Sequence, residues 1–470
     1  MKKHSDHSAS RRGFIKKTAL AGAAFVAIPG GIKGQQILVR PETAAEYQKY
    51  SPNDTIRLAV IGMGIMGHNN INAALKVPGT EMVAACDLYQ GRLDRAQELF
   101  GKDLFITKDY RKILERKDID AVIVATSDHW HDHISIAAMK AGKAVYCEKP
   151  MVHKLDEGHA VIKTQKETGM VFQVGSQGVS SIINDKAKAL FEEGAIGDLV
   201  LVDIYNDRFS AMGAWQYSIP TDASSKTVDW DNFVGDAPKR TYDSNHFFRW
   251  RNYQEYGTGV AGDLFVHLFS RLHRITSSMG PERIYATGGL RHWKDGRNVP
   301  DIMAALYDYP ASDAHAAFNV QMRVNFTDGS GGGSHARMVG TEGVMELGYN
   351  SITVKRNKLA DAPGYGGWDS FGTFTKAQQA EYEKWYQAKF PQKGPEVKGP
   401  DEFEYVLPKG YNDHVHHYEN FFAGMREGKV IVEDASFGLR AAGPPLASNM
   451  SYFEKKTINW DPVEMKVLDS

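Results

Sequence analysis

The chain has 470 residues, of which 42% are hydrophobic and 24% charged, with a formal net charge of −1. This composition is typical of a globular protein long enough for two domains. The near-zero charge gives no argument for nucleic-acid binding or for an anionic membrane surface. Two cysteines, Cys86 and Cys147, exclude a disulfide framework. No apolar run reaches the roughly 18 residues that a membrane span needs.

The first residues are typical of an export signal. Residues 10–16, Ser-Arg-Arg-Gly-Phe-Ile-Lys, are similar to the twin-arginine consensus, and a weakly apolar stretch follows at 18–28. We therefore expect a twin-arginine signal peptide over residues 1–34 and a linker over 35–54. The protein is expected to be periplasmic or otherwise exported by the twin-arginine route.

A dinucleotide-binding fingerprint opens the first folded domain. The apolar run 56–61 leads directly into Gly62-x-Gly64-x-x-Gly67. Gly62 permits a tight turn, Gly64 lets a pyrophosphate approach the backbone, and Gly67 lets the following helix pack closely. The free N–H groups and positive dipole end of that helix would face the phosphates, which adds Ile65 and Met66 to the expected cofactor contacts.

The end of the second strand indicates which dinucleotide is bound. The apolar run 82–86 ends in Asp87, about 20 residues after the glycines, as the fingerprint requires. Asp87 can accept hydrogen bonds from both ribose hydroxyls and would repel a 2′-phosphate. The sequence therefore predicts NAD in preference to NADP.

The next segments alternate between helices and strands. Helices are expected at 67–76, 91–99, 110–116, 133–141 and 154–168, and strands at 121–125, 144–147 and 171–174. This alternation indicates crossover units and a parallel sheet. We expect an α/β fold that begins with a Rossmann domain over residues 55–175.

Three motifs of this domain resemble the Gfo/Idh/MocA family of oxidoreductases. They are Thr126-Ser127-Asp128-His129-Trp130-His131, Ala141-Gly142-Lys143 and Glu148-Lys149-Pro150. The resemblance implies an enzyme that transfers a hydride between NAD and a CH–OH group. It also implies cofactor contacts from Thr126, Asp128, His131, Glu148 and Lys149, although Asp128 stands where the family often has Asn.

Residues 176–470 are expected to form a C-terminal α+β domain for substrate binding and oligomerisation. Strands expected at 199–205, 283–288, 302–309, 316–326, 335–339 and 344–347 indicate a large, mainly antiparallel open sheet. Such sheets often pair through their exposed faces, so we expect a homo-oligomer. Residues 358–400 are expected to form a long excursion on the surface. Helices are expected at 411–426 and 435–455, the second interrupted by Pro444-Pro445, and the resemblance implies that both pack against the nucleotide domain.

Three residues are the candidates for catalysis. Oxidation of an alcohol needs a group that takes the hydroxyl proton. Lys149 ends a strand, where open α/β sheets place ligands, and a partly desolvated lysine can act as acid or base. Asp263 and His267 are spaced i, i+4 and would share one face of a helix. The family has a similar Asp-x-x-x-His beside its lysine, which implies that His267 transfers the proton and that Asp263 binds substrate hydroxyls or orients the imidazole. Whether Lys149 or His267 is the main acid or base stays open.

Aromatic and charged residues indicate a carbohydrate substrate. Trp130 and His131 should lie near the nicotinamide, and Arg249 and Trp250 belong to a polar, aromatic segment at 240–253. Aromatic faces pack on sugar rings, and Arg bonds hydroxyl groups. The histidine spacings at 131–133 and 414–417 lack the accompanying ligands of a metal site, so no metal is expected.

Two alternatives stay open. The first is a glycoside-cleaving enzyme that oxidises, eliminates, hydrates and reduces its sugar, as the NAD-dependent α-N-acetylgalactosaminidases of this fold do. Their pattern has Val in place of the lysine of Glu-Lys-Pro, which this chain keeps as Lys149. The second is a non-catalytic sugar or cofactor sensor, against which the intact Lys149, Asp263 and His267 argue.

The export signal has a consequence for the cofactor. The destination compartment is not expected to hold free NAD, so an enzyme that released NADH would stop after one cycle. We therefore expect tightly bound NAD. A second substrate would reoxidise the bound NADH, as in the glucose–fructose oxidoreductase of this family. Alternatively, a single substrate would be oxidised and then reduced again within one catalytic cycle.

Overall fold

The structure is a computed structural model that describes residues 54–359, 362–391, 396–398 and 403–468. The expected signal peptide and all but the last residue of the expected linker lie outside these ranges. In the described part of the chain, none of the helices combines the length and the apolar character of a membrane span.

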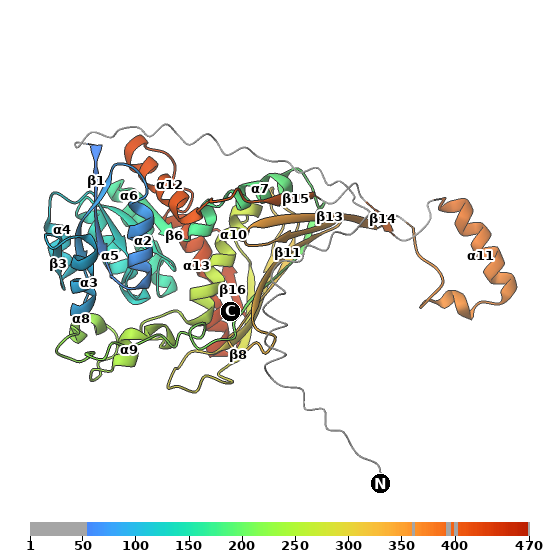
Figure 1. The fold of residues 1–470 in the computed structure, drawn as a ribbon. Helices are drawn as coiled ribbons and strands as arrows, with labels where there is room; N and C mark the ends of the chain where they lie inside the picture. The colour runs from blue at the N-terminus through green and yellow to red at the C-terminus, as the bar shows by residue number, and fades with distance from the viewer. Residues whose placement is uncertain (1–53, 360–361, 392–395, 399–402, 469–470) are drawn as a thin grey trace, which may run out of the picture. The chain divides into compact units, whose positions relative to one another are not determined.

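The first sheet has six parallel strands in the order β3-β2-β1-β4-β5-β6 (Figure 1). The strands are β1 (Ile56–Ile61), β2 (Thr80–Cys86), β3 (Phe105–Thr107), β4 (Ala121–Val124), β5 (Ala144–Glu148) and β6 (Phe172–Gly175). The helices between them are α2 (Ile65–Ala74), α3 (Gln90–Phe100), α4 (Tyr110–Glu115), α5 (His131–Lys140) and α6 (Gly158–Thr168). β4 and β5 are buried along their whole length, as expected for a parallel sheet covered on both faces. The predicted Rossmann arrangement is confirmed; the short edge strand β3 was not predicted.

The second sheet has eleven strands in the order β14-β13-β12-β11-β7-β10-β9-β8-β16-β17, with β15 paired to β13. Its strands are β7 (Leu199–Asp207), β8 (Arg283–Gly289), β9 (Ile302–Tyr309), β10 (Phe318–Asn325), β11 (Gly333–Gly340), β12 (Gly343–Leu347), β13 (Ser351–Leu359), β14 (Glu396–Lys398), β15 (Phe403–Val406), β16 (Ile458–Asp461) and β17 (Lys466–Val467). Among the strand pairs of this sheet that the structure describes, only β7–β10 is parallel, so the predicted mainly antiparallel sheet is confirmed.

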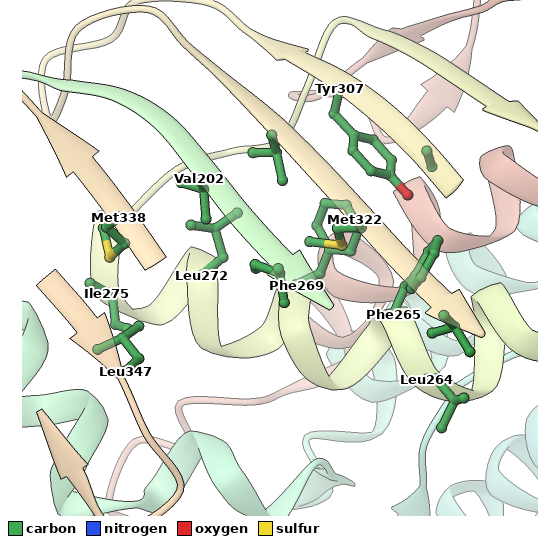
Figure 2. Close-up of a cluster of buried hydrophobic side chains, with 14 of the residues drawn as sticks. Val202, Leu264, Phe265, Phe269, Leu272, Ile275, Tyr307, Met322, Met338 and Leu347 are labelled. Atoms are coloured by element: carbon green, nitrogen blue, oxygen red, sulfur yellow. The ribbon is translucent and has the colours of Figure 1, made fainter. Parts of the chain in front are cut away.

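The helices after the first sheet are α7 (Ile182–Glu192), α8 (Trp230–Val234), α9 (Ser244–Phe248), α10 (Val266–Thr276), α11 (Lys376–Lys389), α12 (Asp413–Glu427) and α13 (Ala435–Glu454). β10 alternates strictly between buried and exposed residues over most of its length. Its buried face contacts α10, where Phe269 and Leu272 lie beside Val202 and Met322 of the sheet (Figure 2). This packing fixes the helix that follows Asp263 against the sheet.

The two C-terminal helices pack on the first sheet. The ring of Tyr418 on α12 stacks on Tyr146 of β5, with centroids 4.4 Å apart. Leu439 and Leu446 of α13 belong to the core that contains β4 and β5. The C-terminal domain is therefore anchored to the nucleotide-binding domain through buried apolar contacts.

One sequence prediction about a helix was wrong. Pro444 and Pro445 do not interrupt α13, which continues through both. Residues 441–448 are all buried, and we attribute the tolerance of two prolines, each of which costs about 3 kcal/mol in a helix interior, to this packing. Residues 358–400 include the 14-residue helix α11, which begins with a capping box between Thr375 and Gln378.

Candidate active site

The glycine turn joins β1 to α2 at the carboxyl end of the first sheet. Gly62 has a φ of 99°, and a Cβ there would overlap the carbonyl oxygen of Ala125. A Cβ at Gly67 would overlap the carbonyl oxygen of Gly62. At Gly64 the nearest atom to an added Cβ is 3.8 Å away, in the guanidinium of Arg92. Gly64 is the N-cap of α2, so the N–H groups of Ile65 and Met66 lie at a helix start that has no capping side chain, which fits a pyrophosphate.

Asp87 supports this turn and contacts a basic residue that the sequence reasoning missed. Its Oδ2 accepts a hydrogen bond from the Met63 N–H at 2.8 Å, and its Oδ1 accepts one from the Tyr89 N–H at 2.9 Å. Arg92 lies 3.4 Å from Oδ2 and covers the ring of Phe248 at 5.4 Å. An aspartate at this strand end suits the ribose of NAD, whereas a neighbouring arginine is the group that accommodates a 2′-phosphate.

The loop after β4 contacts the C-terminal domain at several points. Asp128 is 1% exposed, and its Oδ2 accepts hydrogen bonds from the Thr258 N–H at 3.0 Å and the Thr258 hydroxyl at 2.8 Å. Trp130 donates its indole N–H to the Phe233 carbonyl at 2.9 Å. Asp128 and Trp130 were expected to contact the cofactor or the sugar. Both side chains line the cavity, and both are hydrogen-bonded to residues of the second domain.

The loop also joins the end of β5. His131 is buried and its Nδ1 donates to the Pro150 carbonyl at 2.7 Å. Its Nε2 lies 3.4 Å from the Thr126 carbonyl. Glu148 accepts hydrogen bonds from Asn70 of α2 at 2.9 Å and from Gln177 at 2.8 Å. These contacts hold the backbone on both sides of Lys149 in place.

Lys149 meets Asp263 across the domain boundary. The Lys149 Nζ donates to the Asp263 Oδ1 at 2.8 Å and to the Asp263 carbonyl at 2.9 Å. Arg251 Nε lies 3.2 Å from the same Oδ1. The side chains of Lys149 and Asp263 are 9% and 7% exposed. Although burial opposes ionisation, Lys149 and Arg251 hold the pKa of Asp263 below its usual range, so this carboxyl is ionised.

His267 completes the cluster. Asp263 lies in a π-helical turn, Ala261–Phe265 (η6), that runs into α10, and His267 is the second residue of α10. Burial and the nearby Lys149 charge lower the pKa of His267 to about 3. The imidazole is therefore neutral at physiological pH and able to accept a proton.

One cavity of about 590 Å³ joins the glycine turn to this cluster. Its first half is lined by Gly62, Gly64, Ile65, Met66, Asp87 and Thr126. Its second half contains Lys149, Asp263 and His267 together with residues that the sequence reasoning did not select: Arg208, Tyr217, Arg251, Arg271, His335, Asp413 and His414. Only the tertiary structure reveals them, because they come from separate elements.

The structure separates the two residues expected from the aromatic segment. Trp250 lines the cavity. Arg249 is not among the described residues that do so, and its guanidinium instead donates to the Tyr217 carbonyl at 2.8 Å and to Gln216 at 2.6 Å. The neighbouring Arg251 enters the site in its place. Within the described ranges, no group of three His, Cys, Asp or Glu side chains could hold a metal ion.

Comparison with known proteins identifies the first domain. Residues 56–176 match the Gfo/Idh/MocA model, described as an oxidoreductase family with an NAD-binding Rossmann fold. This match covers the first domain only. The glycine turn and the strand-end Asp87 both lie within the matched residues.

Curated members of the Gfo/Idh/MocA family match mainly this domain. Inositol 2-dehydrogenase of Salmonella typhimurium is 27% identical over 168 residues, which are 35% of this chain and 49% of that enzyme. Glycosyl hydrolase family 109 protein 1 of Bacteroides fragilis is 37% identical over 123 residues, 24% of this chain and 26% of that protein. The chain thus spans about half the length, or less, of the curated relatives it matches.

Solved structures extend the likeness to both domains. Levoglucosan dehydrogenase, in complex with NADH and levoglucosan, has a TM-score of 0.59 and 18% identity, and the likeness covers 86% of this chain and 99% of that one. A myo-inositol dehydrogenase structure from Sinorhizobium meliloti has a TM-score of 0.55 and 17% identity over 86% of this chain and 99% of that one. At these identities the likeness shows the two-domain fold alone.

Proposed function

We propose that the protein is an NAD-dependent oxidoreductase that acts on a CH–OH group of a sugar, sugar derivative or polyol. One observation carries the proposal: Lys149, Asp263 and His267 meet where the cavity passes from the glycine turn to the C-terminal domain. Bound NAD would supply the hydride acceptor. The names of the relatives, inositol and levoglucosan dehydrogenases, support a polyhydroxylated substrate.

The geometry suggests separate roles for lysine and histidine. An ammonium group has three donors, and Lys149 uses two of them on Asp263. The third is available for the alcohol oxygen, whose developing negative charge it would stabilise. His267, kept neutral by its lowered pKa, would take the hydroxyl proton as the hydride leaves the carbon. Asp263 would hold the ammonium in place and balance its charge.

Lys149→Ala and His267→Ala test these roles. We expect each variant to lose about 10²- to 10⁴-fold in kcat while it still binds NAD, because neither side chain belongs to the glycine turn. Lys140→Ala and His159→Ala, at exposed helix positions of the first domain, are the controls. Near-normal kcat in either active-site variant would show that its assigned role is wrong.

A second candidate function is redox-neutral glycoside cleavage. The 37% identity to a glycosyl hydrolase family 109 protein over part of the first domain favours it. Here the sugar would be oxidised, lose its leaving group by elimination, gain water and be reduced again. Chromogenic aryl glycosides distinguish the two functions: release of the phenol without net NADH indicates cleavage, whereas stoichiometric NADH without phenol indicates simple oxidation.

We further propose that the protein is exported by the twin-arginine route with NAD retained. The motif at residues 10–16 supports export. The contacts of Trp130 with Phe233, and of Arg92 with Phe248, place second-domain residues against the nucleotide-binding half, which supports slow release. The test is to purify the protein without added cofactor, denature it and assay the supernatant for NAD(H). Stoichiometric NAD(H) supports retention, and an empty protein that accumulates free NADH overturns it.

A further inference from the structure

The substrate half of the cavity is lined by charged side chains of both signs. Its cationic residues are Lys149, Arg208, Arg251 and Arg271, and the carboxylates Asp128, Glu148, Asp263 and Asp413 line the cavity beside them. Asp128, Glu148 and Asp263 already bond other residues of the protein. The cations that make no ion pair therefore bear on the substrate that this half of the cavity binds.

The existing ion pairs leave two guanidinium groups without a carboxylate partner. Asp263 is shared by Lys149 and Arg251, at 2.8 and 3.2 Å. Arg208 donates to the Gly213 carbonyl at 3.0 Å and lies over the ring of Phe326. Arg271 donates to the amide oxygen of Asn184 at 3.1 Å. Neither makes an ion pair with any residue that the structure describes, and burial lowers the pKa of Arg271 although Asp413 acts against this.

Both arginines are placed beside the proposed reaction centre. Asp263, His267 and Arg271 follow one another at intervals of four residues along η6 and α10 and line the same cavity. Arg208 follows β7, and its charge is one of those that lower the pKa of His267. A molecule at His267 is therefore within range of both guanidinium groups.

We propose that the substrate is an anionic sugar whose carboxylate or phosphate group is bound by Arg208 and Arg271. The hydroxyl-bearing carbon would then lie at Lys149 and His267, so the inference rests on the proposed oxidoreductase function. Guanidinium groups bind planar or tetrahedral anions through two parallel charge-assisted hydrogen bonds. An anion would also add counter-charge beside two partly buried cations that make no ion pair within the described ranges.

Matched pairs of sugars test the inference with the NAD-loaded full-length protein. The pairs are glucuronate with glucose and galacturonate with galactose, and glucose 6-phosphate separates a phosphate site from a carboxylate site. An artificial electron acceptor that reoxidises the bound NADH allows repeated turnover, from which kcat and KM are measured, and calorimetry gives binding. We expect the preferred anionic sugar to have a KM at least about tenfold below that of its neutral partner.

Variants connect that preference to the two arginines. Arg208→Gln and Arg271→Gln should each raise the KM of the anionic sugar by about tenfold to a hundredfold, with kcat changed less. Both changes should affect the KM of the neutral sugar clearly less than that of the anionic sugar. Arg271→Lys, which keeps the charge, should recover part of the loss. The control is Arg283→Gln, at an exposed position on β8 that pairs with Asp308.

The outcomes separate this inference from the proposed function. Neutral sugars oxidised as readily as their acids would overturn the inference and leave the oxidoreductase function standing. Anions that bind in an arginine-dependent way without any turnover would support the anion site and contradict the oxidoreductase. Absence of both binding and turnover of every anionic sugar would overturn the inference.

Discussion

Three carboxylates in this protein each bond or contact several partners at once. Asp263 joins Lys149 and Arg251, and Asp128 satisfies both the N–H and the hydroxyl of Thr258. Asp87 holds two backbone N–H groups and contacts Arg92. Each is buried, so its polar atoms depend on these hydrogen bonds and ion pairs in place of water. Loss of one such carboxylate should therefore disturb more than one contact.

Asp128 provides a test of the link between the loop after β4 and the C-terminal domain. Asp128→Ala leaves the buried N–H of Thr258 without its partner and should lower the free energy of unfolding by about 1–3 kcal/mol. Asp128→Asn retains an oxygen in the same place and should cost clearly less. Urea unfolding of both variants measures the difference. Equal destabilisation by Ala and Asn would show that the hydrogen bonds to Thr258 are not the reason for the loss.

Asp87 and Arg92 should set the preference between the two dinucleotides. We expect tighter binding of NAD than of NADP, and Asp87→Ser should narrow the gap because it removes the charge that repels a 2′-phosphate. Arg92→Gln should weaken NADP about tenfold and NAD less. Arg95→Gln, at an exposed position on the same helix, is the control. Titration of each apo-protein with NAD and with NADP measures the affinities, and tighter NADP binding by the unmodified protein would contradict the assignment.

Helices α10 and α13 connect the two sheets. α10 packs against the large sheet, while the turn before it carries Asp263 to Lys149. α13 contacts both domains, with Leu439 and Leu446 in the first core and Ala447 in the second. Small residues let this helix approach its neighbours. A Cβ at Gly438 would lie 2.6 Å from the Val174 side chain of β6.

Gly438→Ala tests how closely α13 must approach the first sheet. Val174 is buried and has little room to move, so the added methyl should lower the free energy of unfolding by about 1–3 kcal/mol. Ser436→Ala, at a half-buried position of the same helix, is the control. Since Val174→Ala removes the obstructing methyl groups, the double variant should cost less than the sum of the two single changes. A strictly additive result would mean that this contact is not the cause.

The whole molecule contains several buried histidines that are neutral when it is folded. Burial lowers the pKa of His129, His267 and His273 to about 3 and that of His417 to about 4. In the unfolded chain each would titrate near 6.5. Between these values the unfolded state binds more protons, so stability rises with pH and is lost as the pH falls from about 6.5.

Two glutamates act in the opposite direction over part of this range. Burial raises the pKa of Glu157 to about 7 and that of Glu433 well above its ordinary value. Between about pH 4.5 and 6.5 these groups are protonated mainly in the folded state and offset part of the histidine effect. Below about pH 4.5 the unfolded chain also protonates them, and the offset disappears.

We therefore expect the free energy of unfolding to fall on acidification below about pH 6.5 and to fall more steeply below about pH 4.5. Urea unfolding at a series of pH values measures this profile. His273→Gln removes one group that binds a proton on unfolding. The slope of the free energy of unfolding against pH should therefore fall by about 1.4 kcal/mol per pH unit. The exposed His159→Gln should leave the slope unchanged. An unchanged slope in His273→Gln would show that His273 titrates alike in both states.

Local patterns were sufficient for the parallel sheet and for the glycine turn. The strand β9 has the predicted bounds, and the close approaches at Gly62 and Gly67 are those that the fingerprint requires. These features depend on residues adjacent in the chain, where periodicity and backbone sterics act directly. The short strands β3 and β14 to β17 lack such a pattern, because they are held by their sheet partners. The capping box of α11 was present in the sequence and was overlooked.

The sequence by itself determined the kind of protein: its motifs identified a Rossmann domain, an NAD fingerprint and the set Lys149, Asp263 and His267. The tertiary structure alone decided that Arg251 rather than Arg249 enters the site, that Asp128 bonds Thr258, and that Arg208 and Arg271 line the substrate half. The physical reason is distance along the chain. Lys149 and Asp263, 114 residues apart in the sequence, influence one another only after the two sheets and α10 have brought them together, and no local spacing encodes that contact.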